Sequence, residues 1–469
     1  MTISFKRHVM HQTIHSYSKF HEAGHGTFFS SQFDNGSKRF LLVYDCGSRR
    51  SSRMPALSRD LQDHYAGNLI NLLCVSHFDA DHVNGLVHLL ENFRVDTLAL
   101  PYLPLVKRLK VVCEFDSKKK ENVDVALFTL DPVEYLRRRV GQDRIARIVF
   151  VRGGAEPAPP PSEARYPEGE DGPPRGNDRS DDKGIKSDLY WDSEELGTGS
   201  DGPYATLNLK GLPANISARL LTIDHSKLAT LFEGLWEFVF YNTALPDDIT
   251  PESGASLTDV RLEISKILEE HCLFSTGSTA VPGWRKKLRE CYDKHFGSDG
   301  PERNNISLCL LSRPVTNAST RIDECKWFDP AKSELGTGSN IITSPRPEKC
   351  GLLLTGDISL DSDETRRMEF HFLKSRWETI FVMQVPHHGS EKSWVKGTAK
   401  NCYHEHSVAC VPDSDKDGHH PHDNVLDDLI GRNFIRANYS ASVIFAFHVG
   451  WGRKIQIPKS PHVAIAATP

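Results

Sequence analysis

Apolar runs of strand length alternate with amphipathic segments through the first third of the chain. Residues 69–75, LINLLCV, are typical of a buried strand, and residues 145–153, IARIVFVRG, predict another. Residues 57–68 and 131–142 carry apolar side chains at helical spacing. The turn DNGS at residues 34–37 separates two β-rich runs and predicts a hairpin. Strands that alternate with helices predict an α/β fold.

The last third of the chain repeats this pattern more densely. Residues 349–359, KCGLLLTGDIS, and residues 379–390, TIFVMQVPHHGS, predict strands that end in polar side chains. Residues 363–375 predict a helix, and residues 417–431, DGHHPHDNVLDDLIG, predict a loop that leads into another. Polar groups are therefore expected at the ends of buried strands.

Three segments interrupt the alternation of strands and helices. Residues 153–204 are dominated by proline, glycine and charge, and they predict a disordered insertion because too little apolar surface is present to offset the entropy of ordering. Amphipathic patterns at residues 256–274 and 284–296 predict a helical insertion, and residues 316–348 are expected to be rich in loops. The expected organisation is a first half of the fold at residues 1–152, the disordered insertion at 153–204, strands with helical and loop insertions at 205–349, and a second half at 350–469.

Composition and charge limit the class of protein and its expected location, but they do not identify its chemistry. The chain has 469 residues, with 62 acidic and 57 basic side chains, so it is long enough for a large core and shows no overall basic bias toward nucleic acid. The start lacks the apolar core of a signal peptide, and no apolar run is long enough to span a membrane. Ten cysteines without a CxxC pair are typical of reduced thiols. We therefore expect a cytoplasmic protein with no membrane partner, and the oligomeric state stays open.

Four polar clusters each follow an apolar run. Active sites of open α/β sheets assemble at the carboxyl ends of strands, so the four clusters are expected to converge. Imidazoles and carboxylates brought together in this way are ligands for one or two divalent metal ions. The clusters are His77, Asp79, Asp81 and His82 in SHFDADHVNG, then Asp357, then His387 with His388, and finally His420 with His422.

These motifs, in this order, resemble those of the metallo-β-lactamase superfamily. SHFDADHVNG is similar to its His-x-His-x-Asp-His motif, LLVYDCGS to its first motif, LLLTGDIS to the strand that presents a metal-bridging aspartate, and VPHHGS to its late histidine motif. The series HFDADH, TGD, HHGS and HPH resembles in particular the hydrolase domain of the DNA-uptake competence (ComEC-type) proteins and their stand-alone relatives. The resemblance spans roughly residues 14–150, 205–245, 303–312 and 350–455, and it implies an αβ/βα sandwich with the site at the mouth between two sheets.

The resemblance also implies roles for individual residues. The expected metal ligands are His77, Asp79, Asp81, His82, Asp357 and His387. The expected catalytic residues are Asp81, His388 and His422, and the expected substrate contacts are Ser390 and His420. Asp45 is expected to support the motif loop. Which histidine of HHGS binds the metal stays open.

Two departures from the superfamily pattern affect the expected metal. Asp79 stands where most members have histidine, and the usual histidine-bearing loop later in the chain is not evident, with His225 and His271 as the candidates. A site poorer in imidazole suits harder ions, so manganese or magnesium is expected beside zinc. Of the histidines in the first hairpin, His25 is the one that could reach the site, and a packing role is the alternative.

The expected function is a metal-dependent hydrolase, a phosphodiesterase or nuclease in which a metal-activated water attacks phosphorus in a nucleic acid or nucleotide. By analogy, such a protein could be an effector in a bacterial defence system. A lactonase or thioesterase on the same fold is one alternative. The other is a metal-poor interaction module whose insertions bind a partner protein.

Overall fold

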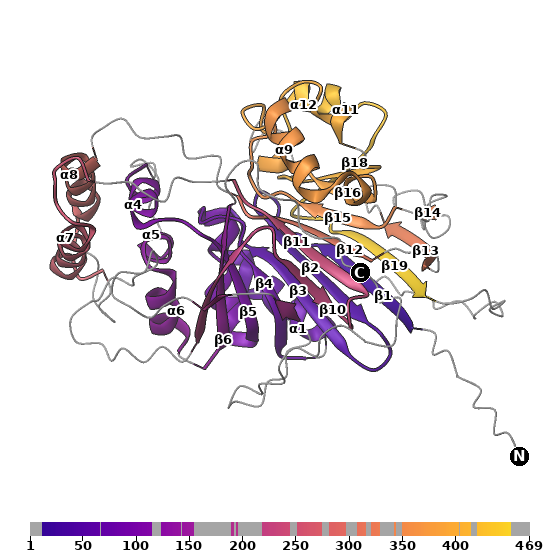
Figure 1. Cartoon of the computed structure of the whole chain (residues 1–469), viewed down its shortest axis with the longest axis horizontal. Helices are drawn as coiled ribbons and strands as arrows, with labels where there is room; N and C mark the ends of the chain where they lie inside the picture. Colours follow the sequence, from indigo (N-terminus) through magenta and orange to yellow (C-terminus); the bar gives the residue numbers. More distant parts are fainter. Residues whose placement is uncertain are drawn as a thin grey trace, which may run out of the picture.

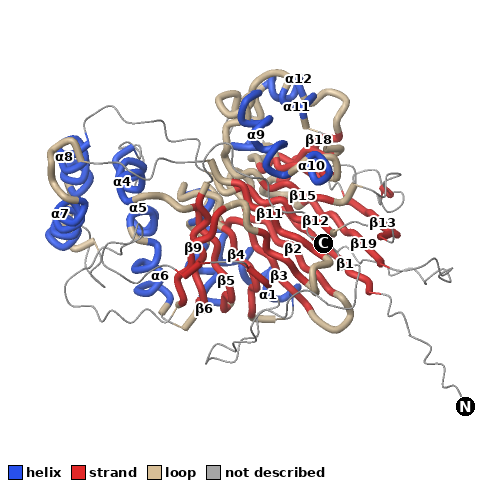
Figure 2. The backbone as a smooth tube through the Cα atoms, in the orientation of Figure 1, coloured by secondary structure: helices blue, strands red, loops and turns tan. Residues whose placement is uncertain are grey.

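The protein forms two β-sheets with helices packed against them (Figure 1). The computed structural model describes residues 12–65, 67–114, 123–141, 143–153, 189–191, 194–195, 218–243, 251–273, 281–296, 307–315, 320–328, 342–343, 349–402, 404–413 and 420–451. The predicted α/β class is confirmed. Figure 2 shows the strands of the two sheets side by side, with helices at both sides of them.

The larger sheet is mixed. Its strand order is β14-β13-β19-β1-β2-β3-β4-β5-β6-β9-β8, parallel from β3 to β9 and antiparallel from β13 to β3. The strands are β1 (Gln12–Phe20), β2 (Phe28–Asp34), β3 (Arg39–Cys46), β4 (Leu69–Cys74), β5 (Arg94–Pro101), β6 (Ile145–Arg152), β8 (Glu194–Glu195), β9 (Arg219–Asp224), β13 (Thr320–Phe328), β14 (Ile342–Thr343) and β19 (Val443–Trp451).

The smaller sheet has the order β18-β17-β16-β15-β12-β11-β10-β7. It is parallel from β15 to β18 and antiparallel from β7 to β15. The strands are β7 (Tyr190–Trp191), β10 (Leu228–Leu231), β11 (Trp236–Tyr241), β12 (Cys309–Pro314), β15 (Gly351–Leu354), β16 (Ile380–Gln384), β17 (His406–Cys410) and β18 (Asn433–Ala437).

Successive side chains of a strand point to opposite faces, and this alternation builds the core between the sheets. Leu42 of β3 and Leu352 of β15 face one shared cluster, in which Phe33 of the larger sheet packs against Trp236 of the smaller one at 4.8 Å between ring centroids. Val43, the neighbour of Leu42, lies in a different cluster beneath the helices. Strands buried on both faces explain why these sequences are continuous apolar runs rather than alternating ones.

Helices cover the outer face of each sheet. The helices on the side of the larger sheet are α1 (Met54–Tyr65), α3 (Leu86–Asn92), α4 (Leu105–Glu114), α5 (Val123–Leu130) and α6 (Pro132–Val140). The helices α7 (Leu257–Glu270) and α8 (Trp284–Phe296) pack against other helices, α8 against α4 and α7 against α8. Those that pack with the smaller sheet are α9 (Ser362–Phe372), α10 (Lys374–Trp377), α11 (Thr398–Asn401) and α12 (Asp423–Asp428). Within the described residues, no helix is long and apolar enough to cross a membrane.

Several local expectations can be compared with the structure. The two helices predicted in the insertion are α7 and α8, and α8 lies beside α4 (Figure 1). The stretch 316–348 was expected to be rich in loops, and that expectation is wrong for residues 320–328, because they pair along β19 as the strand β13. Of the expected disordered insertion, residues 190–191 and 194–195 form β7 and β8, residues 189 and 153 are also described, and the remainder lies outside the described residues.

Candidate metal centre

The predicted motifs meet at the carboxyl ends of three strands from both sheets. The motif loop follows β4 of the larger sheet, Asp357 follows β15, and His387 and His388 follow β16 of the smaller sheet. The loop between β1 and β2 adds His25. Leu308 N donates to Ser76 O at 2.8 Å and so joins the two sheets directly beside the motif. The carboxyl ends of parallel strands in both sheets therefore converge on one place.

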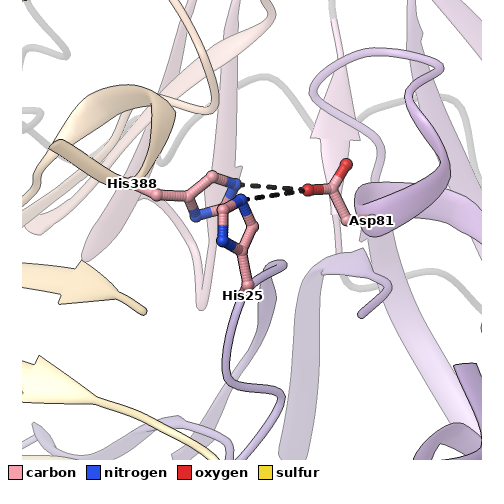
Figure 3. A group of neighbouring side chains, drawn as sticks. All are labelled: His25, Asp81 and His388. Atoms are coloured by element: carbon pink, nitrogen blue, oxygen red, sulfur yellow. Dashed lines mark ion pairs between the residues drawn. The ribbon is translucent and has the colours of Figure 1, made fainter. Parts of the chain in front are cut away.

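Two groups of side chains form there, each with ligand atoms close enough to share a metal ion. In the first group, His77 Nε2 and His82 Nε2 lie 3.5 and 3.3 Å from the two carboxylate oxygens of Asp357. In the second, His388 Nε2 and His25 Nε2 lie 3.5 and 3.8 Å from Asp81 Oδ2, and both rings face that carboxylate (Figure 3).

In three of these rings, the protein forms a hydrogen bond with Nδ1, and this bond fixes the orientation of the ring. His388 Nδ1 lies 2.8 Å from the carbonyl oxygen of Cys410, so Nδ1 carries a proton and donates it. Ser76 Oγ donates to Asp45 at 2.7 Å and therefore accepts from His77 Nδ1 at 2.9 Å. His82 Nδ1 lies 2.8 Å from Asp45 Oδ2. A ring held through Nδ1 presents Nε2 to the centre, which is the arrangement that metal-binding histidines adopt.

Several polar atoms in these two groups are buried without a hydrogen bond. Buried nitrogen and oxygen atoms of folded proteins almost always have a partner, so a cluster of exceptions indicates a missing ligand. Their imidazole and carboxylate chemistry fits a divalent cation such as zinc or manganese. Within the two groups, the buried atoms without a hydrogen bond are Nε2 of His77, His82 and His388, both ring nitrogens of His25, and Oδ1 of Asp357.

Electrostatics in the two groups also favour a cation. Burial raises the pKa of Asp81, but the neighbouring His388 and His82 outweigh burial and hold that pKa below its usual range. The pKa of Asp357 is likewise low: burial raises it, but the neighbouring His82 and His77 outweigh that effect. Burial and the charge of His388 lower the pKa of His25 to about 2, so its ring is neutral. Two charged carboxylates and a neutral imidazole are ready to bind a metal.

His82 differs from the other rings because its pKa is raised. Burial lowers this pKa, but the carboxylates of Asp357 and Asp45 outweigh burial. The Asp45 carboxylate that accepts from its Nδ1 is completely buried. Without metal, the His82 ring is therefore protonated, and metal binding must release its Nε2 proton.

The backbone around the centre adopts unusual conformations and brings two loops into close contact. Asp45, His387 and His388 have φ values of 55°, 48° and 57°, a left-handed conformation that side chains other than glycine rarely adopt. Such conformations cluster at functional sites, where surrounding contacts hold them. At Gly47, a Cβ atom would lie 2.4 Å from the backbone of Asp81, so only glycine lets the β3 loop pack against the motif loop.

The remaining predicted residues lie around the two groups. His387 Nε2 is 3.7 Å from Asp357 Oδ2, and the side chain is more exposed than that of His388. The ring of His420 lies 5.6 Å from that of His25, and the ring of His422 lies 4.8 Å from that of His420. Both histidines of HHGS are thus near the centre, and the metal role predicted for His387 and the catalytic role predicted for His388 stay predictions.

Asp79 and Ser390 have less central positions. Asp79 is half-buried at the start of α2 (Ala80–Val83) and lies outside both groups. Ser390 is buried, and its hydroxyl accepts from Lys392 N at 3.4 Å. The metal role of Asp79 and the substrate contact of Ser390 stay predictions.

His225 and His271, the two candidates for the missing histidine loop, belong to other surroundings. His225 follows β9 and packs against His371, with 4.2 Å between ring centroids. His271 ends α7 and its Nδ1 lies 2.9 Å from Val281 O. Neither belongs to a potential metal group among the described residues.

A third cluster of ligand types lies in the helical insertion, where Glu263, Cys291 and His295 are close together. Here both ring nitrogens of His295 are bound, Nε2 to Glu263 at 3.0 Å and Nδ1 to Ser253 at 2.6 Å. The protein itself satisfies this histidine, in contrast to the rings of the two groups described above.

His25 is the residue of the centre for which the sequence left a packing role open. It lies between Gly24 and Gly26, both with positive φ, in a tight loop that turns its ring toward Asp81.

In comparisons with known proteins, no protein-family model and no curated protein matches this chain. Function is therefore inferred from the geometry of the centre and the chemistry of its residues.

Proposed function

We propose that the protein is a metal-dependent hydrolase of phosphodiesters, with a nucleic acid or a nucleotide as substrate. The observation that carries the proposal is the set of buried histidine Nε2 atoms without hydrogen bonds, which converge on two carboxylates. Two sheets with helices on their outer faces and a centre at the strand ends also support the metallo-β-lactamase type of sandwich as a proposal for the fold.

The residues of the two groups would hold one or two divalent ions, His77, His82 and Asp357 in one group and His25, Asp81 and His388 in the other. A divalent ion bound there lowers the pKa of a water and neutralises charge that develops on the ester. The chain contributes fixed ring orientations, through Asp45 and the Cys410 carbonyl, before any substrate arrives.

A proton donor for the leaving group is available beside the centre. His422 Nδ1 lies 3.2 Å from Glu391 N and 3.4 Å from Gly389 O, and these contacts place the ring beside the HHGS loop. Burial and the charges of His388 and His422 lower the pKa of His420 to about 4, so His420 is neutral at pH 7. The predicted role of His422, protonating a leaving oxygen, is kept as part of the proposal because its ring lies 4.8 Å from that of His420 beside the centre.

The surroundings favour an anionic ester over a neutral one. Arg49, His387, His420 and His422 lie around the two groups, and their ring and guanidinium N–H groups are donors suited to phosphate oxygens. A lactonase or thioesterase would not need these donors. This difference separates the two hydrolase hypotheses experimentally.

The test is hydrolysis by metal-free protein reconstituted separately with manganese, magnesium and zinc. The substrates are bis(p-nitrophenyl) phosphate, single-stranded and double-stranded DNA, RNA, p-nitrophenyl acetate and a lactone. We expect phosphodiester turnover, and its loss in Asp81→Ala and His82→Ala, with circular dichroism unchanged. Asp63→Asn, an exposed change on α1, is the matched control.

Turnover of the carbonyl esters alone would select the lactonase or thioesterase hypothesis. No turnover of any substrate, together with no metal uptake, would refute a hydrolase and favour the interaction module. Full activity of Asp81→Ala at unchanged metal content would refute the proposed centre.

A further inference from the structure

We propose that Arg49 is the residue that recognises the anionic group of the substrate, an inference that rests on the proposed phosphodiesterase function. Arg49 follows β3, in the sequence SRRSSR, and its Nε lies 3.7 Å from Asp81 Oδ2. Its backbone N donates to His25 O at 2.7 Å. Arg49 is therefore tied to two residues of the second group, one through its side chain and one through its backbone.

The loop that carries Arg49 is held firmly in place. The preceding residue, Ser48, is completely buried and donates through Oγ to Ala23 O at 2.6 Å. Asn84 binds both backbone groups of Ser48, accepting from its N at 3.1 Å and donating to its O at 2.6 Å. A side chain on such a support can act on substrate without a large loss of backbone entropy.

The three arginines of this loop have different surroundings. Arg50 stacks over the ring of Tyr439 at 4.0 Å, and Arg53 Nη2 donates to Tyr439 O at 2.7 Å. These two arginines fasten the loop to the segment between β18 and β19. Arg49 turns the other way, toward Asp81.

The pairing of Arg49 differs from that of a structural arginine. Arg376, the structural example, binds both oxygens of Glu237 at 2.8 and 3.0 Å with its side chain 2 % exposed. The side chain of Arg49 is 49 % exposed, and its contact with Asp81 is 3.7 Å long. A guanidinium has five N–H donors in a planar fork, so the terminal nitrogens of Arg49 remain accessible to an oxyanion.

The charge of Arg49 reaches both sides of the centre. It is among the causes that lower the pKa values of His25 and His420, which belong to different loops. A phosphate between these loops would meet the guanidinium on one side and the ring of His420 on the other. Arginine forms two parallel hydrogen bonds with phosphate, which gives both orientation and affinity.

The experiment compares Arg49→Ala, Arg49→Lys and the control Arg59→Ala in the metal-loaded full chain. Arg59 is exposed on α1, so the control removes the same charge away from the centre. We expect Arg49→Ala to raise KM for bis(p-nitrophenyl) phosphate about tenfold and to weaken inhibition by inorganic phosphate about tenfold, as expected when one charge-assisted hydrogen bond is lost. KM for p-nitrophenyl acetate should change less than about twofold, because that ester is neutral.

Arg49→Lys should keep part of the phosphate affinity, since lysine retains the charge but not the planar fork. Arg59→Ala should match the wild type. Equal KM and phosphate inhibition in Arg49→Ala and Arg59→Ala would overturn the proposal. An equal rise of KM for the phosphate and acetate esters would also overturn it, since that result assigns Arg49 to general support of the centre.

The two proposals can fail separately. If the wild type hydrolyses no phosphodiester, the proposed function fails, and calorimetric titration of the metal-loaded protein with inorganic phosphate still tests Arg49. About tenfold weaker phosphate binding by Arg49→Ala at equal metal content would support the role of Arg49. Equal binding, or loss of metal with unchanged affinity per loaded site, would overturn it.

Discussion

Replacing Asp45 with asparagine tests how the protein prepares His82 for a metal. The Asp45 carboxylate is completely buried and accepts from Ser76 N at 2.6 Å, Ser76 Oγ at 2.7 Å and His82 Nδ1 at 2.8 Å. Asparagine has the same shape and tolerates the φ of 55° at this position. Asp45→Asn therefore removes the charge with little change of packing or backbone.

The expected loss of stability follows from these three hydrogen bonds. A hydrogen bond to a charged group contributes about 1.5–3 kcal/mol and a neutral one about 0.5–1.5 kcal/mol, so each bond weakens by about 1 kcal/mol. Three bonds give a decrease of about 3 kcal/mol in the free energy of unfolding of the metal-free protein.

The expected effect on metal binding comes from the tautomer of His82. If the amide oxygen of the introduced asparagine stays with Ser76 N, its NH2 group faces His82 Nδ1, which must then accept. The ring of the variant then keeps its proton on Nε2, the atom that points to Asp357 at 3.3 Å, and a metal could take that position only if the contact between Nδ1 and the amide were broken. We expect metal affinity to fall by about 10–100-fold, the range measured when residues that orient metal ligands are replaced.

Urea unfolding of the metal-free protein gives the stability, and competition with a chelating dye gives the metal affinity. Asp63→Asn on α1 is the control, because Asp63 is exposed. If Asp45→Asn matched this control in both measurements, the assignment of Asp45 as the group that orients His82 would be wrong.

Three further results are expected. Manganese should support faster phosphodiester turnover than magnesium or zinc, and Asp79→His should shift the metal preference toward zinc. This expectation would be contradicted if the wild type were fastest with zinc and Asp79→His had the same metal preference. Gly47→Ala should lose metal and stability, because its Cβ would lie 2.4 Å from the backbone of Asp81; dye competition and a melting curve like those of the wild type would show that the loop moves aside. Burial lowers the pKa values of His371 and His404 to about 3 each from the ordinary 6.5, so the unfolded chain binds protons that the folded protein excludes. The stability of metal-free protein should therefore rise with pH between about pH 4 and 6, by about 2.7 kcal/mol per pH unit from these two residues. In urea unfolding, His404→Gln should lower that slope by about 1.4 kcal/mol per pH unit, and an unchanged slope would show that His404 is not the titrating group.

The pH window depends on groups whose folded pKa is depressed. His82 has the opposite sign: its pKa is raised in the folded protein from the ordinary 6.5, so its contribution to stability is complete below that value and is lost as the pH rises through its folded pKa. The two effects therefore separate along the pH axis. Between about pH 4 and 6, loss of stability on acidification reports on the buried neutral histidines, whereas the carboxylates with depressed pKa values, Asp81 and Asp357, lose their contribution at lower pH.

The sequence determined much of the local structure because local patterns are set by local physics. Continuous apolar runs produced β4, β6 and β15, and the amphipathic spacing at residues 256–274 and 284–296 produced α7 and α8. Residues 82–93 carry Val83, Leu86, Leu90 and Phe93 at the spacing of one helix, whereas the structure divides the segment into α2 and α3 on either side of Asn84 and Gly85. Gly85 N there donates to Cys46 O at 2.8 Å, a tertiary contact that no local pattern contains.

The strand β13 also depends on a tertiary contact that the local sequence does not predict. Residues 320–328 lie within a stretch that looked rich in loops, and they become a strand because β19 offers an edge for antiparallel pairing. Pairing with a distant partner overrides local propensity.

The sequence by itself identified which potential metal ligands lie at strand ends, because polar residues that follow buried strands can be recognised along the chain. Only the tertiary structure decided how they are grouped: His77 and His82 with Asp357, and Asp81 with His388 and His25. His25 comes from a hairpin well before the motif loop in the sequence, and Arg49 from the loop after β3. Which side chains share a metal or face a substrate depends on the packing of two sheets against each other, and that packing is a property of the whole chain rather than of any segment.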